Sequence, residues 1–224
     1  MRFGFIVYPQ VQLMDVVGPL EVLNMWRMLD PTVEIVYIAE TLCPMDLGSG
    51  FTLKIDYTFQ DAPQLDVLFV PGGVGRLTQM NNPQLQRFIQ TQYAGCKLIT
   101  AICTGAFLLY KAGILKNQKT TTYWRALPEL SHLENIQICE ERIVKSGKIW
   151  SSGGVTSGID LMFAVVNELA GQAVAGKVQL LFEYFPNQTV YCTPEDIETL
   201  PPYSNEANQA QSLPKYIREY LKNM

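Results

Sequence analysis

The sequence predicts an α/β fold, a three-layer sandwich in which helices cover both faces of a mostly parallel sheet. Three observations lead to this prediction. Short apolar stretches typical of buried strands alternate along the chain with longer stretches of helical spacing. Glycine-rich turns follow several of the expected strands. The 224 residues contain no internal repeat or linker that would divide them, and they are numerous enough for one well-packed core.

The first half of the chain is expected to supply several strands of the sheet. The expected elements are strands at residues 2–8, 33–39 and 65–70, a hairpin or excursion at 41–57, and helices at about 18–29 and 83–95. The first helix is expected to start near Gly18 because Pro19 is tolerated in a first turn. Asp15 would then lie at the carboxyl side of the first strand. Its two candidate roles are a helix N-cap and a part in catalysis, and both can hold at once.

The second half is expected to continue the alternation and to end in an extension. The expected elements are strands at residues 98–102, 120–124, 136–139, 142–145 and 149–151, and helices at 104–112, 159–169 and 172–184. Another short helix is expected to follow the 120–124 strand. Residues 187–224 are polar and proline-rich, with a short helix expected near 213–221. We expect this extension to pack on the domain formed by residues 1–186 or on a partner subunit.

A cysteine lies where the 98–102 strand must bend into the next helix. The small residues Thr104, Gly105 and Ala106 after Cys103 allow a sharp bend, which is the geometry of a nucleophile elbow. The thiol would project toward solvent, and the amides at the helix start would lower its pKa. The alternative is a core cysteine that fills a small gap. The elbow context favours a reactive thiol.

Several polar or glycine-rich segments follow expected strands and should meet at one edge of the sheet. These are Asp15, residues 71–75, Cys103, Tyr123 and residues 153–156. The 71–75 glycine cluster lacks the spacing of a phosphate-binding loop, so we expect its amides to form one side of an oxyanion hole. An acid, two glycine turns and a thiol would therefore share one crevice.

Composition argues against several classes of function. The chain carries 17 basic and 21 acidic residues without a basic run, so nucleic acid is not an expected partner. Apolar stretches fall short of the roughly 18 residues of a membrane span, and we expect a cytoplasmic protein without a membrane partner. The five cysteines are odd in number and never closely spaced, and His132 is the one histidine, which argues against a disulfide framework and a metal site.

The combined motifs resemble the ThiJ/PfpI superfamily, a branch of the class I glutamine amidotransferase-like fold with a flavodoxin-like sandwich. The matching motifs are Asp15 with Gly18-Pro19, Pro71-Gly72-Gly73, Ile102-Cys103-Thr104-Gly105, Thr121-Thr122 and residues 153–160. The Asp15 segment, the elbow and residues 178–184 are similar to the isocyanide hydratase branch. The superfamily also includes sensor domains of certain AraC-type regulators.

The resemblance implies a catalytic site and a mechanism. Cys103 would be the nucleophile and Asp15 its acidic partner, while backbone amides near Gly73 and Thr104 would hold developing negative charge. The substrate pocket would be formed by Gly72, Tyr123, Val155 and Thr156. Thr104 and Tyr123 depart from the family pattern, since some members have histidine at these positions. Because two anions disfavour each other, we expect Asp15 to have a raised pKa and to titrate together with Cys103.

The expected reaction is hydration of an isocyanide to an N-substituted formamide, on a small-molecule substrate and without cofactor or metal. Two alternatives remain open. One is hydration of a reactive carbonyl such as glyoxal by the same nucleophile. The other is a non-catalytic redox or metabolite sensor, although an AraC-type regulator would need a helix-turn-helix domain, which we do not find in this chain. A homodimer is expected from the resemblance.

Overall fold

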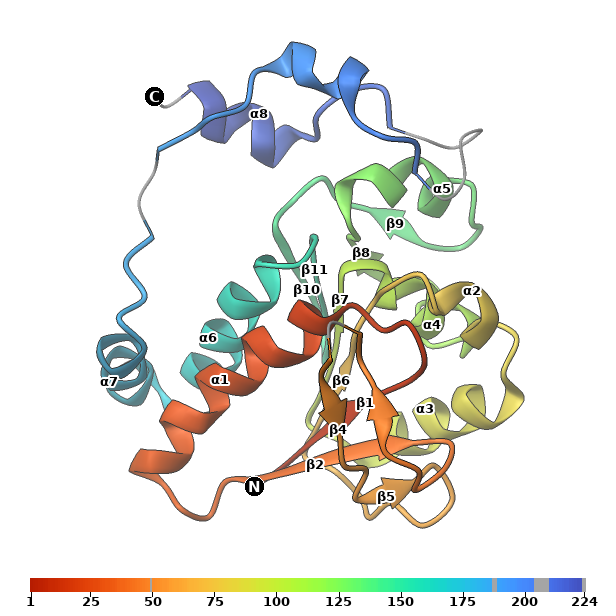
Figure 1. The fold of residues 1–224 in the computed structure, drawn as a ribbon, viewed down its shortest axis with the longest axis vertical. Helices are drawn as coiled ribbons and strands as arrows, with labels where there is room; N and C mark the ends of the chain where they lie inside the picture. The colour runs from red at the N-terminus through yellow and green to blue at the C-terminus, as the bar shows by residue number, and fades with distance from the viewer. Residues whose placement is uncertain (49, 187–188, 204–209, 223–224) are drawn as a thin grey trace.

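A seven-stranded sheet with the order β10–β11–β7–β6–β1–β2–β5 forms the centre of the protein (Figure 1). The computed structural model describes residues 1–48, 50–186, 189–203 and 210–222. Ser49 of the predicted excursion, and residues 187–188, 204–209 and 223–224 of the predicted extension, lie outside the described residues. The sheet strands are β1 (Arg2–Ile6), β2 (Glu34–Ala39), β5 (Tyr57–Thr58), β6 (Val67–Val70), β7 (Leu98–Ile102), β10 (Ile143–Ser146) and β11 (Ile149–Ser152). Neighbouring strands pair in parallel except β10 and β11, which are antiparallel.

Helices cover both faces of this sheet. The α-helices are α1 (Leu13–Leu29), α2 (Arg76–Gln79), α3 (Pro83–Gly95), α4 (Ala106–Lys111), α5 (Leu127–Ser131), α6 (Ser157–Ala170), α7 (Gln172–Phe182) and α8 (Lys215–Lys222). Figure 1 shows α1, α6 and α7 on one side of the sheet and α2, α3 and α4 on the other. The predicted flavodoxin-like three-layer α/β sandwich is confirmed.

The central strands are apolar because they are covered on both faces. All five residues of β7 and all four of β6 are buried, as expected for parallel strands between two helical layers. Phe5 of β1 and Phe69 of β6 stack with ring centroids 4.7 Å apart. The register pairs Val70 with Ala101 and Ser152 with Ile102, so β6, β7 and β11 end at the same edge. The loops that follow these three strands meet there.

Helix α1 begins one turn earlier than predicted and contains Pro19 in its interior. Gly18 allows close packing against α6, since a Cβ at this position would lie 3.1 Å from a side-chain carbon of Ile159. Buried Val16 adds to the packing of the turn that precedes the proline. The N-cap is Gln12, so the N-cap role considered for Asp15 is wrong. Asp15 instead lies in the first helical turn.

Several segments deviate from a simple alternation of strands and helices. The predicted 41–57 excursion contains an antiparallel pair, β3 (Met45–Asp46) and β4 (Thr52–Leu53). The predicted 120–124 strand is wrong beyond Thr120, because β8 (Lys119–Thr120) is short and pairs with β9 (Gln137–Ile138) outside the main sheet. Short 3₁₀ turns occupy Cys103–Gly105, Trp124–Ala126 and Pro194–Thr199. Within the described ranges, no helix has the length and apolar character needed to cross a membrane.

Candidate active site

Cys103 lies at the bend between β7 and α4 and has a left-handed backbone, with φ of 55°. Its N–H donates to the Gly153 carbonyl over 2.8 Å, and its own carbonyl accepts from the Thr122 hydroxyl over 2.7 Å. Such a conformation costs about 1–3 kcal/mol and persists where the surroundings enforce it. A Cβ at Gly105 would lie 2.1 Å from the Val70 carbonyl oxygen, so glycine is required there. The bend is therefore a tightly held elbow that fixes the position of the sulfur.

Asp15 reaches the elbow from the first turn of α1 and is fully buried. Its Oδ2 accepts a hydrogen bond from the Gly72 N–H over 2.9 Å. Its Oδ1 is also buried, and among the described residues the carboxyl has no donor besides the Gly72 N–H and the Cys103 thiol. The Cys103 thiol is an electrostatic neighbour of this carboxyl. The structure thus brings together the acid and the thiol that the sequence placed on separate loops.

Burial governs the protonation of both groups. Burial raises the pKa of Asp15 from 3.8 to about 7, and donors from Gly72 and Cys103 oppose the rise. Burial and then the neighbouring Asp15 charge raise the pKa of the Cys103 thiol. The amides of Thr104 and Val155 and the Thr104 hydroxyl, which donate toward the sulfur, oppose that rise.

The raised thiol pKa corrects the sequence-based expectation of a lowered one. Cys103 is 8% exposed, so its sulfur does not project freely into solvent as expected. Desolvation outweighs the amides at the start of the short helix α4. The raised pKa expected for Asp15 is confirmed, but its main cause is burial rather than repulsion by a thiolate.

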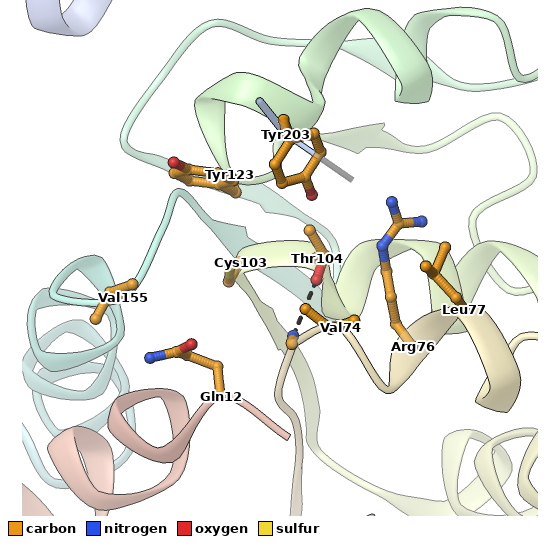
Figure 2. Close-up of a pocket in the computed structure, with 10 residues that line it drawn as sticks. Gln12, Val74, Arg76, Leu77, Cys103, Thr104, Tyr123, Val155 and Tyr203 are labelled. Carbon is orange, nitrogen blue, oxygen red and sulfur yellow. Dashed lines mark hydrogen bonds between the residues drawn. The ribbon is translucent and has the colours of Figure 1, made fainter. Parts of the chain in front are cut away.

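A pocket of about 240 Å³ opens above the elbow (Figure 2). Five of the residues predicted for the site line it, namely Gly73, Cys103, Thr104, Tyr123 and Val155. The other three, Asp15, Gly72 and Thr156, do not line it.

The three predicted site residues that do not line the pocket lie in different surroundings. Asp15 is buried beside the elbow, and Gly72 is the donor that holds its carboxyl. Thr156 is exposed, and its hydroxyl accepts from the Arg142 guanidinium at 3.4 Å. Gly72 and Thr156, which the sequence predicted for the substrate pocket, therefore lie outside the lining of this pocket.

The two glycines after β6 bring this loop against the elbow. A Cβ at Gly72 would lie 2.5 Å from the backbone nitrogen of Thr104, so the two loops can pack only around glycine. The Gly73 N–H donates to the Thr104 hydroxyl oxygen over 3.0 Å (Figure 2). The Gly73 amide is thereby engaged within the protein, which differs from the predicted oxyanion-hole role. The amides of Thr104 and Val155 are the ones directed at the sulfur.

Sequence reasoning missed five further residues that line the pocket, namely Gln12, Val74, Arg76, Leu77 and Tyr203. Arg76 directly follows the glycine cluster, and a charged residue next to an expected site loop could have indicated that it lines the pocket. Its guanidinium forms two hydrogen bonds to Glu129, at 2.9 and 2.5 Å, and lies 4.0 Å from the centre of the Phe107 ring. Tyr203 had no local signal, because tertiary packing alone brings it to the pocket.

Comparisons with known proteins agree with this geometry. The chain is 37% identical to an isonitrile hydratase from Pseudomonas putida over 186 residues, which cover 83% of this chain and 79% of that protein. A crystal structure of a ThiJ/PfpI family protein from Pseudomonas syringae superposes with a TM-score of 0.77 at 29% identity, covering 99% of this chain and 84% of the other.

A more distant similarity is to the HTH-type transcriptional regulator GbdR of Pseudomonas aeruginosa, at 24% identity over 61% of this chain and 37% of the regulator. The sequence model of the DJ-1/PfpI family matches residues 1–168, which include the elbow, the acid and the glycine loops. The chain therefore belongs to the DJ-1/PfpI family.

Proposed function

We propose that this protein hydrates isocyanides to N-substituted formamides, with Cys103 as the nucleophile and Asp15 as the group that moves protons. The observation that carries the proposal is the pairing of an elbow thiol with a buried carboxyl that, in the described part of the chain, has no donor besides the Gly72 N–H and that thiol. Such a carboxyl can both accept and return a proton, since its pKa of about 7 lies near neutral pH. Similarity to an isonitrile hydratase supports it, because isonitrile and isocyanide name the same group.

The raised thiol pKa requires proton transfer to accompany the attack. The sulfur of Cys103 bonds to the terminal carbon of R–N≡C, while the thiol proton passes to Asp15 and then to that carbon. The product of this step is the thioimidate R–N=CH–S–Cys103. The thiol therefore needs no stable ionisation before substrate binds, and the adjacent carboxylate supplies the base.

Water completes the reaction. Its oxygen attacks the same carbon while Asp15 takes one water proton and delivers it to the nitrogen. The tetrahedral adduct R–NH–CH(OH)–S–Cys103 then loses its C–S bond, and the hydroxyl proton returns through Asp15 to the sulfur. R–NH–CHO leaves and the starting thiol is restored. One carboxyl serves each transfer, so His132, which is exposed and does not line the pocket, has no required part.

Turnover with an aliphatic isocyanide tests the proposal. Cyclohexyl isocyanide is incubated with the wild type, Cys103→Ala, Asp15→Asn and the control Cys96→Ala, which alters a buried cysteine that does not line the pocket. We expect formamide from the wild type and the control, and at least a thousandfold loss in Cys103→Ala. Intact mass should show a transient Cys103 adduct heavier by one whole isocyanide. Absence of formamide from the wild type would reject the proposal.

A second candidate is a metabolite-binding sensor, which the similarity to the regulator GbdR favours. The raised thiol pKa argues against a redox version of this role, because the thiolate is the form that oxidants attack. Hydration of a reactive carbonyl such as glyoxal would use the same nucleophile. Glyoxal assayed beside the isocyanide separates the two enzymatic readings, and saturable ligand binding without turnover would favour the sensor.

A further inference from the structure

One wall of the pocket comes from the C-terminal segment, beyond the residues that match the family. Tyr203 is half-buried and lines the same pocket as Cys103. Its ring lies 5.7 Å from that of Tyr123, with an angle of 58° between the two planes. In Figure 2 the two aromatic side chains lie on the side of the pocket opposite Gln12 and Val74. Together they form an aromatic wall that faces the elbow.

The Tyr203 side chain is held from two directions. Arg125 donates a hydrogen bond to the Pro201 carbonyl over 2.6 Å, and its guanidinium carbon lies 5.6 Å from the centre of the Tyr203 ring. Arg76 acts as a hydrogen-bond donor to the Tyr203 hydroxyl, which points toward it in Figure 2. The tyrosine is thus a fixed part of the wall, because both arginines are themselves buried.

Charge and polarity of the lining indicate which substituents fit. The positive charge of Arg76 is matched by Glu129, with which it forms a two-bond ion pair. Val74, Leu77 and Val155 add apolar surface to the two tyrosines. An anionic substituent would lose hydration here at a cost in free energy, because Arg76, the charged residue of the lining, is already paired with Glu129 and Arg125 does not line the pocket. An uncharged apolar substituent loses little on entering.

We propose that Tyr203 determines the substrate range, so that the pocket accepts uncharged isocyanides with a compact apolar substituent and Tyr203 limits the substituent's size. This inference rests on the proposed hydratase function. Because the R–N≡C group is linear, an isocyanide whose terminal carbon meets the Cys103 sulfur carries its nitrogen substituent away from the sulfur, into the space that Tyr123 and Tyr203 line. A pocket of about 240 Å³ has room for a small ring or a branched chain, and a larger substituent would come against the Tyr203 ring.

Kinetics with substituents of increasing size test this assignment. Methyl, cyclohexyl and 2-naphthyl isocyanides are compared in the wild type, Tyr203→Ala, Tyr203→Phe and Tyr191→Ala, the last changing a tyrosine of the same segment that is 92% exposed. We expect Tyr203→Ala to raise the naphthyl-to-methyl ratio of kcat/KM at least tenfold. Tyr203→Phe keeps the ring and should stay within about twofold of the wild-type ratio, as should Tyr191→Ala. An equal loss on all substrates in Tyr203→Ala, or an unchanged ratio, would overturn the assignment.

Thiol alkylation separates failure of this inference from failure of the proposed function. The rates at Cys103 with iodoacetamide and with the bulkier N-phenylmaleimide are measured by peptide mass, which needs no turnover. We expect Tyr203→Ala to raise the maleimide-to-iodoacetamide rate ratio at least tenfold. If the wild type hydrates no isocyanide but this rate ratio rises in Tyr203→Ala, the hydratase assignment is wrong, while the role of Tyr203 in limiting access to Cys103 is supported. If the ratio does not change, the role of Tyr203 is refuted whatever the reaction is.

Discussion

The Gly72 N–H donates to Oδ2 of Asp15 over 2.9 Å, so the loop after β6 fixes the carboxyl that adjoins the Cys103 thiol. This bond occupies one carboxyl oxygen and leaves Oδ1 buried, with the Cys103 thiol as the carboxyl's one further donor among the residues that the structure describes. A buried carboxyl with so few donors costs free energy, which a protein retains where the group has a further use. In the proposed reaction, Oδ1 is the atom that receives and returns the proton.

The first prediction concerns the pH dependence of hydration. Asp15 must begin as a carboxylate to accept the thiol proton, and its pKa is raised to about 7. We therefore expect kcat/KM to increase with pH up to about 7 and then level, falling about tenfold for each pH unit on the acid side. Initial rates between pH 5.5 and 9, with the non-enzymatic rate subtracted, measure this. Asp15→Asn should show no rate above the non-enzymatic background at any of these pH values, and a flat wild-type profile would contradict the assignment.

The second prediction separates thiol reactivity from turnover. The Asp15 charge contributes to the raised pKa of the Cys103 thiol, so Asp15→Asn should lower that pKa toward its ordinary value. Alkylation of Cys103 by iodoacetamide at pH 8 should then become severalfold faster, although hydration is lost. Peptide mass spectrometry measures the rate, with Cys96 in the same samples as an internal control. Slower alkylation in Asp15→Asn would show that the carboxyl does not oppose ionisation of the thiol.

The sheet and the elbow were predictable because their signals are local. Buried runs such as Leu98–Ile102 followed by small residues specify a strand and a sharp bend without reference to distant residues. The positions of Asp15 and Cys103 at one edge followed from the rule that parallel strands end together. The start of α1 was missed because Pro19 suggested the first turn of a helix. The helix instead begins at Leu13, and packing of Gly18 against α6 stabilises the additional residues before the proline.

The chemistry of the site was less predictable because it depends on solvent exclusion. A helix start argues for an ionised thiol, but burial and the Asp15 charge raise the pKa of Cys103. Neither effect can be inferred from neighbours in the sequence. The same holds for Tyr203, which lies one hundred positions after Cys103 in the sequence and reaches the pocket by tertiary packing. Arg76 lies nearer in the sequence, yet its pairing with Glu129 spans 53 positions.

The third prediction concerns the ion pair in the pocket wall. Glu129→Gln leaves the Arg76 guanidinium buried, with a side-chain exposure of 2%, and without its negative partner. We expect a loss of about 2–4 kcal/mol in the free energy of unfolding, measured by urea denaturation. The surface pair Lys145–Glu168 is the matched control, and Glu168→Gln should cost less than about 0.5 kcal/mol. A loss in Glu129→Gln no larger than in the control would show that the guanidinium is solvated.

The fourth prediction is that the proposed proton carrier costs stability. The pKa of Asp15 is raised from 3.8 to about 7 in the folded protein, so the folded state holds this proton more tightly than the unfolded state. Stability contributed by the protonated carboxyl is fully present below pH 3.8 and is lost as the pH rises through about 7. At about 1.4 kcal/mol for each pKa unit, the loss is on the order of 4 kcal/mol.

Asp15→Asn removes this cost because the amide stays neutral and keeps an oxygen that can accept from the Gly72 N–H. We expect the variant to be more stable than the wild type by about 1–3 kcal/mol at pH 8, with the difference shrinking toward pH 5. Urea denaturation of both proteins at pH 5, 6.5 and 8 measures the difference. Equal stability of the two proteins at all three pH values would mean that the Asp15 carboxyl ionises without a cost in folding free energy. Its pKa would then be close to the ordinary value, and Asp15 could not cause the decrease of kcat/KM below about pH 7.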